Sequence, residues 1–136
     1  MGLDMYLTGK KSFSRWKDTK NGEPNPPMTD QDGDPIEESS VELGYWRKHP
    51  NLHGYIVKAF ADGVDECQPI ILAEADLVNI IDRVNHDALP ETSGFFFGKT
   101  DGSEKAGDIV ILQKAIEWMK TDKTGQYRSV VYQASW

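Results

Sequence analysis

The hydrophobic positions of this chain alternate with polar ones in some segments and recur every three or four residues in others. Leu3, Met5 and Leu7 alternate with polar or aromatic neighbours, which predicts a strand at the start of the chain. Three further segments are extended by the same criterion or form short apolar runs. The four predicted strands cover residues 1–7, 41–48, 68–72 and 127–136.

Three segments repeat their apolar residues with helical spacing, which predicts helices that bury one face. Pro50 favours the start of a helix because its missing N–H has no partner in the first turn. The pair Asp62-Gly63 ends that helix. The other two predicted helices cover residues 74–86 and 108–120.

Strands and helices in mixed order, without regular strand–helix–strand alternation, predict an α+β fold. We expect a small mixed or antiparallel sheet of about four strands with about three helices on one face, in a single domain over residues 1–136. Residues 18–40 and 89–107 have neither periodicity and are predicted to be loops. In the second loop, the triplet Phe95-Phe96-Phe97 is expected to anchor the chain in the core.

The charge is concentrated in one segment. The net charge is −7, and residues 18–40 contain seven acidic residues and one basic residue. This acidity disfavours direct binding of nucleic acid, although Lys10, Lys11, Arg15 and Lys17 form a small basic cluster. The acidic loop is suited to a basic partner surface, such as one that binds nucleic acid. We assign partner binding to Asp30, Asp32, Asp34, Glu37 and Glu38.

The remaining composition points to a cytoplasmic protein. The single cysteine, Cys67, excludes an internal disulfide framework and fits a reducing compartment. The first residues lack the basic and apolar regions of a signal peptide. No apolar run approaches the length of a membrane span, so we expect no contact with a membrane.

Two segments resemble known motifs but lack residues that those motifs require. The acidic run at residues 30–34 would be an EF-hand only with glycine at the sixth position and glutamate at the twelfth, where Pro35 and Val41 stand. Residues 94–100 resemble the end of a phosphate-binding loop, but Ser93 stands where its first glycine belongs. We therefore expect neither an EF-hand nor a nucleotide triphosphatase.

His49 and His53 have the spacing that brings two imidazoles together on a helix for zinc. Pro50 leaves His49 outside the regular helix, however, and no third ligand has a characteristic spacing. We predict no metal site and no cofactor. Cys67 could act as a nucleophile beside His53, although a lone cysteine at the start of a strand is more often a small buried hydrophobe.

The richest chemistry lies in residues 44–55, which combine aromatic rings with a guanidinium and imidazoles. We predict a recognition cluster there for a small nucleotide-like ligand, held by stacking and charge-assisted hydrogen bonds. Three residues from other segments are assigned to the same site. The predicted ligand-binding residues are Tyr45, Trp46, Arg47, His53, Thr92, Ser93 and Gln133.

Several segments together resemble an uncharacterised family of small proteins encoded by bacteriophages and prophages. The segments that carry the resemblance are Met1 to Leu7, Glu42 to Lys48, His53, Asp65-Glu66-Cys67, Leu89 to Gly98 and Tyr132 to Trp136. The resemblance implies a phage protein that works in the cytoplasm of its bacterial host. It implies no reaction.

Two classes of function remain open. In the first, the protein is a counter-defence binder that occupies a host protein, such as a nuclease, or sequesters a nucleotide-like ligand. In the second, it is a small hydrolase or transferase that uses His53 with Asp65 or Cys67, and Arg47 as an anion clamp. We favour binding, because no nucleophile and base have the spacing of a known pair.

Overall fold

The structure of the protein is a computed structural model that describes residues 2–14, 16, 19, 22–25, 27–94, 97–121 and 126–136. Its elements follow one another in the order β1 (Asp4–Phe13), β2 (Met28–Thr29), β3 (Pro35–Ile36), β4 (Glu38–Arg47), α1 (Pro50–Phe60), β5 (Ile70–Leu72), α2 (Glu74–Asn85), α3 (Lys105–Lys120) and β6 (Gln126–Ser135). None of the helices in the described residues is long and apolar enough to cross a membrane.

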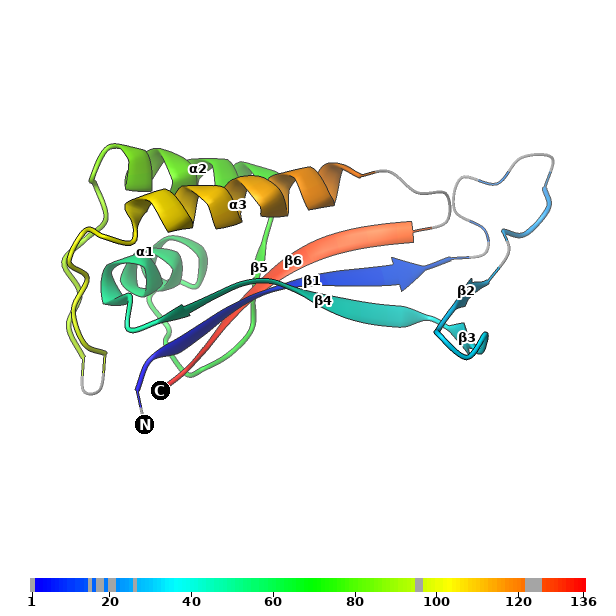
Figure 1. Ribbon diagram of the computed structural model, residues 1–136, viewed down its shortest axis with the longest axis horizontal. Helices are drawn as coiled ribbons and strands as arrows, with labels where there is room; N and C mark the ends of the chain where they lie inside the picture. The colour runs from blue at the N-terminus through cyan, green and yellow to red at the C-terminus, as the bar shows by residue number, and fades with distance from the viewer. Residues whose placement is uncertain are drawn as a thin grey trace.

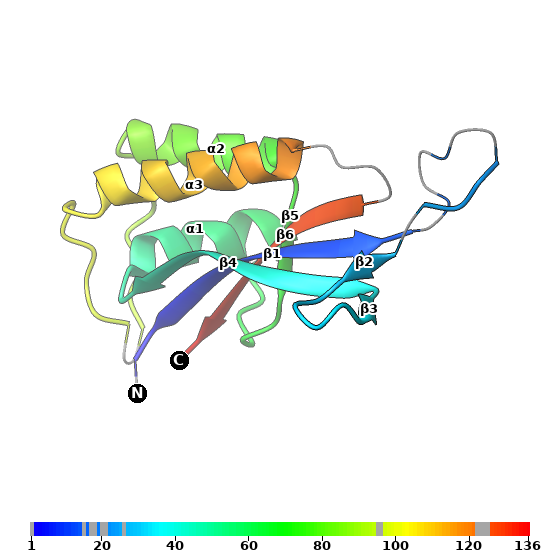
Figure 2. The same ribbon diagram turned by 45° about the vertical axis from the view of Figure 1, so that its right-hand side comes forward.

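Four of the strands form one antiparallel sheet in the order β4-β1-β6-β5. All three helices lie on the same side of this sheet, and the small β2–β3 hairpin extends from one end of it (Figures 1 and 2). Asp4 pairs with Ser135, so the start of β1 and the end of β6 lie side by side. The predicted α+β fold is therefore confirmed, including the helices on one face.

The core lies between the sheet and the helices. Met5 and Leu7 of β1 are fully buried against the helices, whereas Tyr6 between them is 40% exposed on the other side. Each helix contributes a buried stripe of the kind that its spacing predicted, such as Leu77 and Ile80 of α2. Burying a leucine fully contributes about 1.5–3 kcal/mol, so these stripes fix the helices to the sheet.

Two glycines let α3 lie directly on the sheet. A Cβ atom added to Gly9 of β1 would lie 2.7 Å from the ring of Trp118, and one added to Gly44 of β4 would overlap the side chain of Ile111. Since real Cβ atoms do not approach other atoms so closely, a larger residue at either position would push α3 away.

The strand boundaries differ from the prediction. β1 continues to Phe13 rather than ending at Leu7, because its polar second half pairs with both β4 and β6. β4 begins at Glu38, and the predicted loop at residues 18–40 contains the β2–β3 hairpin. Pairing with neighbouring strands, which leaves no mark on local periodicity, decides these boundaries.

The second predicted loop is also shorter than expected, because α3 begins at Lys105 rather than at residue 108. Phe97 is buried in the core, as predicted for the phenylalanine triplet. Several predicted features lie outside the described residues: the first residue of the N-terminal strand, the other two phenylalanines and two members of the basic cluster. These are Met1, Phe95, Phe96, Arg15 and Lys17.

Candidate functional sites

The first two turns of α1 place two histidines inside the protein. His49 immediately precedes the helix and His53 lies one turn later, with exposed fractions of 1% and 2%. A buried imidazole must satisfy both ring nitrogens, and each of these histidines does so with one carboxylate and one hydroxyl. The two hydrogen-bonded groups have the same composition but different surroundings.

The first group, which we call the His49 relay, joins Thr100, His49, Asp108 and Trp46. His49 Nε2 lies 2.7 Å from Asp108 Oδ2, and the indole Nε1 of Trp46 donates to Asp108 Oδ1 over 2.7 Å. His49 Nδ1 lies 2.9 Å from Thr100 Oγ1. Because an ionised carboxylate only accepts, Nε2 of a neutral His49 carries the hydrogen, and Nδ1 accepts the hydrogen of the Thr100 hydroxyl.

The second group, the His53 relay, joins Tyr132, His53, Asp65 and Trp136. His53 Nε2 lies 2.9 Å from Asp65 Oδ2, and the indole of Trp136 donates to Asp65 Oδ1 over 3.2 Å. His53 Nδ1 lies 2.6 Å from the hydroxyl of Tyr132. Burial, with a smaller contribution from the charge of Asp65, raises the pKa of Tyr132 well above its ordinary value. Tyr132 therefore stays protonated and donates to the imidazole.

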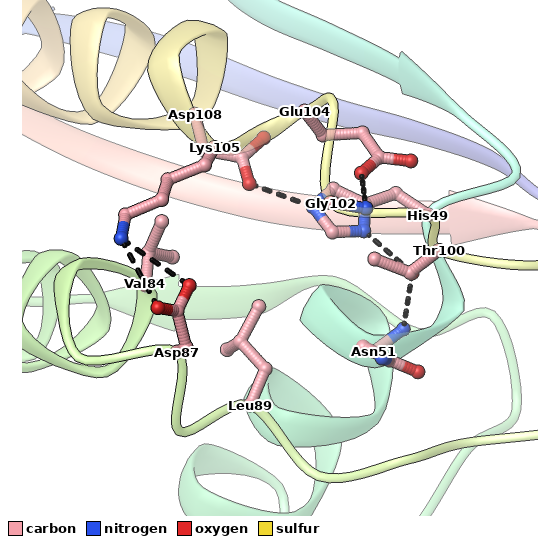
Figure 3. A pocket seen from close by; sticks show the side chains of 10 residues that line it. All are labelled: His49, Asn51, Val84, Asp87, Leu89, Thr100, Gly102, Glu104, Lys105 and Asp108. Carbon is pink, nitrogen blue, oxygen red and sulfur yellow. Dashed lines mark hydrogen bonds and ion pairs between the residues drawn. The ribbon is translucent and has the colours of Figure 1, made fainter.

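The two relays differ in access. Tyr132 is 1% exposed, so its hydroxyl is sealed in the core. Thr100 is only partly buried and borders a cavity of about 180 Å³ between the start of α1, the end of α2 and the start of α3 (Figure 3). Val84 and Leu89 form an apolar wall of this cavity. Lys105 Nζ forms an ion pair with Asp87 at 3.2 Å beside it.

We call the side of the sheet that is turned away from the helices the open face. A larger hollow of about 550 Å³ lies on it. Side chains from three strands and from the segment between α1 and β5 line it. The lining residues are Tyr6, Thr8, Lys10, Ser40, Val41, Glu42, Cys67, Val131, Gln133, Ala134 and Ser135. Hydroxyls, an amide, a cation and a carboxylate thus meet an aromatic ring in one hollow.

Two tyrosines form a cross-strand pair beside this hollow. Tyr6 and Tyr45 are register partners in β1 and β4, with ring centroids 5.2 Å apart. Tyr45 also donates its hydroxyl hydrogen to a carboxylate oxygen of Asp4, and this hydrogen bond raises the pKa of Tyr45. Arg47, the register partner of Asp4, is exposed in the row next to the tyrosine pair.

The structure separates the predicted recognition cluster into three places. Tyr45, Arg47 and Gln133 belong to the open face. Trp46 lies between Tyr45 and Arg47 in β4 and points to the helices, where it belongs to the His49 relay. His53 borders a third hollow of about 380 Å³. The expectation of one cluster is therefore wrong, because neighbouring residues of a strand point to opposite faces.

Thr92 and Ser93 do lie near His53, as predicted, since both border the third hollow. The backbone N–H of Thr92 donates to Oδ1 of Asn51 over 3.0 Å. A Cβ atom added to Gly54 would overlap the Thr92 side chain, so the loop lies directly on α1.

The structure also separates the residues that the enzyme hypothesis brings together, since they lie on opposite sides of the sheet. Asp65 pairs with His53, as that hypothesis requires. Cys67 instead borders the open-face hollow, and its backbone carbonyl accepts the side-chain N–H of Gln133 at 2.8 Å. Arg47 lies on the open face, whereas His53 of α1 is buried on the helix side of the sheet.

The five acidic residues assigned to partner binding are all exposed. Three of them, Asp30, Asp32 and Asp34, place carboxylate oxygens within 4.8 Å of one another at the tip of the β2–β3 hairpin. Asp30 Oδ1 accepts the backbone N–H of Asp32 at 2.9 Å and of Asp34 at 3.0 Å, which shapes the hairpin turn. The clustering thus has a local structural cause, since exposed acidic groups are common without an ion.

The sequence reasoning missed Asp108 and Thr100. Asp108 shares the buried face of α3 with Leu112 and Ala115, and an acid on an apolar stripe must find a partner inside the protein. The spacing of Asp108, Leu112 and Ala115 in the sequence was therefore enough to predict that Asp108 is buried. Thr100 lies in a loop, where no periodicity marks it.

Comparison with known proteins adds no relative: no protein-family model, no curated protein and no solved structure matches this chain. The resemblance to phage-encoded proteins therefore stays a prediction.

Proposed function

We propose that the protein binds a nucleotide on its open face, with the base, the sugar and the phosphate on three successive rows of the sheet. The order of side chains across β1, β4 and β6 is the observation that carries this proposal. Every second residue of a strand points to the same face, so the rows are centred on Tyr6, Thr8 and Lys10. Successive rows are about 6.6 Å apart, which suits the three parts of a nucleotide.

The first row suits a base. Tyr6 is 40% exposed and Tyr45 is 44% exposed, so both rings offer surface for stacking. Stacking of a base on an aromatic side chain contributes about 1–3 kcal/mol. Gln133 is the register partner of Tyr6 in β6, and its Nε2 donates to the carbonyl of Cys67. Its Oε1 is then the acceptor that an amino group of a base would use.

The next two rows suit the sugar and the phosphate. Glu42 is the partner of Thr8, and a carboxylate accepts hydrogen bonds from the hydroxyls of a ribose. Ser40 is the partner of Lys10, so an ammonium and a hydroxyl lie together in the third row. Charge-assisted hydrogen bonds of this kind bind phosphate oxygens.

A mononucleotide fits this surface better than a nucleic acid does. The chain carries a net charge of −7, and binding of a polyanion depends on a basic surface that releases many counterions. One phosphate beside Lys10 needs no such surface. The hollow of about 550 Å³ also lies within the range of about 300–1,000 Å³ that is typical of small-molecule sites.

The enzyme alternative has less support. It requires His53, with Asp65 or Cys67, to act on one substrate together with Arg47. Both ring nitrogens of His53, however, are taken by Tyr132 and Asp65. Arg47 belongs to the opposite side of the sheet.

In the phage setting that the resemblance implies, sequestering a host nucleotide signal would inhibit a defence system in the bacterial cytoplasm.

Calorimetric titration with nucleoside monophosphates and cyclic nucleotides tests this proposal. We expect at least one nucleotide to bind, and Tyr6→Ala to weaken its binding about tenfold or more, from the loss of stacking. Lys10→Gln should also weaken binding. Lys11→Gln is the matched control, because it removes the same charge from the neighbouring position on the other face of β1.

Two results would contradict the proposal. One is that no nucleotide in the panel binds while the protein is folded. The other is that Lys11→Gln weakens binding as much as Lys10→Gln does, since the effect would then reflect net charge rather than a contact.

The acidic hairpin supports a second candidate function, the occupation of a basic host protein surface. Asp30, Asp32 and Asp34 are exposed together at its tip, and Glu37 and Glu38 follow on the same segment. Complementary charge of this kind speeds association and selects partners. If it operates, a variant with asparagine at the three aspartate positions will lose a basic protein that the wild type captures from host lysate. Equal capture by both proteins would exclude it.

A further inference from the structure

The cavity beside the His49 relay holds an arrangement that the proposed function does not use. Thr100 donates its hydroxyl hydrogen to His49 Nδ1 over 2.9 Å, and His49 Nε2 is oriented by Asp108 at 2.7 Å. A hydroxyl, an imidazole and a carboxylate in this sequence form the nucleophile–base pair with an orienting group that covalent catalysis requires. Trp46 fixes the carboxylate in turn.

The start of α1 acts on the same oxygen. The backbone N–H of Asn51 donates to Thr100 Oγ1 over 3.1 Å. This N–H belongs to the first turn of an 11-residue helix, whose N-terminal end carries a partial positive charge. Negative charge that develops on Thr100 Oγ1 as its hydrogen leaves is therefore stabilised at this position.

Access to a substrate distinguishes this relay from the His53 relay. Both relays join a hydroxyl to a histidine and an aspartate, but the hydroxyl of Tyr132 is sealed in the core. Thr100 borders the cavity of about 180 Å³, and so does His49 (Figure 3). The His53 relay is thus an internal control of nearly the same composition.

We propose that Thr100 is a nucleophile that accepts the acyl group of a small, uncharged ester, with His49 as its base. The cavity is smaller than the roughly 300–1,000 Å³ of sites for drug-sized ligands, so it limits the acyl group to a short chain. Val84 and Leu89 give that chain an apolar wall. The surroundings disfavour an anionic substrate, because three carboxylates face one ammonium in the lining. These groups are Asp87, Glu104, Asp108 and Lys105.

The reaction proceeds in two balanced steps. Thr100 Oγ1 attacks the acyl carbon while its hydrogen passes to His49 Nδ1. The bond between the acyl carbon and the leaving oxygen breaks, and the leaving oxygen departs with the hydrogen from His49. A water molecule then gives a hydrogen to His49 and attacks the acyl-threonine, which releases the carboxylic acid and restores the Thr100 hydroxyl.

Asn51 is placed to assist the first step. Its side chain borders the cavity, and its Oδ1 accepts the backbone N–H of Thr92 at 3.0 Å, which fixes the orientation of the amide. Nδ2 is then the end that donates to the oxygen of the substrate carbonyl as negative charge develops there.

Acylation by p-nitrophenyl acetate tests the proposal directly. The intact protein is treated with this ester at neutral pH, quenched in acid and digested with trypsin, which releases residues 100–105 as one peptide. We expect an acetyl group on Thr100, located by fragmentation, and an initial burst of p-nitrophenolate of about one equivalent per protein, followed by slower release as the acyl-threonine is hydrolysed. Ser103 in the same peptide has an exposed hydroxyl that donates to Asp101, and it serves as the internal reference.

Variants separate a nucleophile from a structural hydroxyl. Thr100→Ser keeps the hydroxyl and should still be acetylated, whereas Thr100→Val should reduce p-nitrophenolate release about 100-fold or more. Tyr132→Phe changes the sealed relay and should leave the acetylation of Thr100 in place. The wild-type measurement stands even if Thr100→Val does not fold. Acetyl groups found on lysines or on Ser103, with none on Thr100, would overturn the proposal.

Discussion

His49 and His53 lie one turn apart at the start of α1, and Nε2 of each bonds a different aspartate, at 2.7 Å and 2.9 Å. Asp108 belongs to α3, and Asp65 belongs to the segment between α1 and β5. Together the two pairs tie α1 to both of its neighbours through buried or half-buried hydrogen bonds. The same helix also supplies a residue to each of the two hollows on the helix side.

Replacing Asp108 with alanine should destabilise the fold strongly. His49 and Trp46 would each lose a buried acceptor, and each buried donor left without a hydrogen bond costs about 1–3 kcal/mol. Asp87→Asn is the control, because it removes an exposed charge that is paired with Lys105. Asparagine also tolerates the φ of 53° at this position, so stability should change little. Urea unfolding of both variants measures the difference, and equal midpoints would show that the His49 relay contributes nothing to stability.

The two tryptophans that orient the aspartates should differ in importance. Trp46→Phe removes a hydrogen bond to a fully buried carboxylate and should cost about 1.5–3 kcal/mol. Trp136→Phe removes a longer hydrogen bond to the half-buried Asp65 and keeps the ring that packs on Phe97, so it should cost less. The free energies of unfolding of the two variants test this order. A larger loss for Trp136→Phe would contradict it.

Replacing Gly9 of β1 or Gly107 of α3 with alanine should change the stability of the fold in opposite directions. Gly9→Ala brings a Cβ atom within 2.7 Å of the Trp118 ring and should cost about 1–3 kcal/mol through overpacking. A Cβ atom at Gly107 of α3 meets no atom within 4 Å. Gly107→Ala should therefore stabilise the helix by about 0.5–1 kcal/mol. Thermal unfolding of the two variants checks both signs.

Alkaline pH should weaken the fold through Tyr132. Its pKa is raised in the folded state, mainly by burial, above the value near 10 that it has when unfolded. The folded state therefore holds this proton more tightly, so stability is complete below about pH 10 and falls as the pH rises beyond it. Tyr132→Phe should be less stable at neutral pH but should lose less additional stability between neutral and strongly alkaline pH. Urea unfolding at several pH values measures that slope, and an unchanged slope would refute the assignment.

The sequence predicts the helices of this fold better than its strands. The stripes of α2 and α3 and the proline at the start of α1 are local signals, and they place three helices within a few residues of their observed bounds. The second half of β1 is polar, and only its pairing with β4 and β6 makes it a strand.

The hydrogen bonds of the two relays could not be predicted from the sequence for a related reason. The partners of His49 lie 51 and 59 residues away in the chain, so no local spacing connects them. Reading His49 as a residue outside the helix was correct, but this position is what lets its ring reach Thr100 and Asp108. Trp46 and Arg47 were grouped because they are adjacent, whereas the pleat of β4 sends them to opposite faces.

The most direct test of nucleotide binding is the change in backbone amide NMR shifts when the tightest-binding nucleotide of the calorimetric panel is added. We expect the largest changes in the three rows around Tyr6, Thr8 and Lys10, including Gln133 in β6. Thr100 and the acidic hairpin should change little. Largest changes at Thr100 or in the hairpin, or none at all up to millimolar nucleotide, would contradict it.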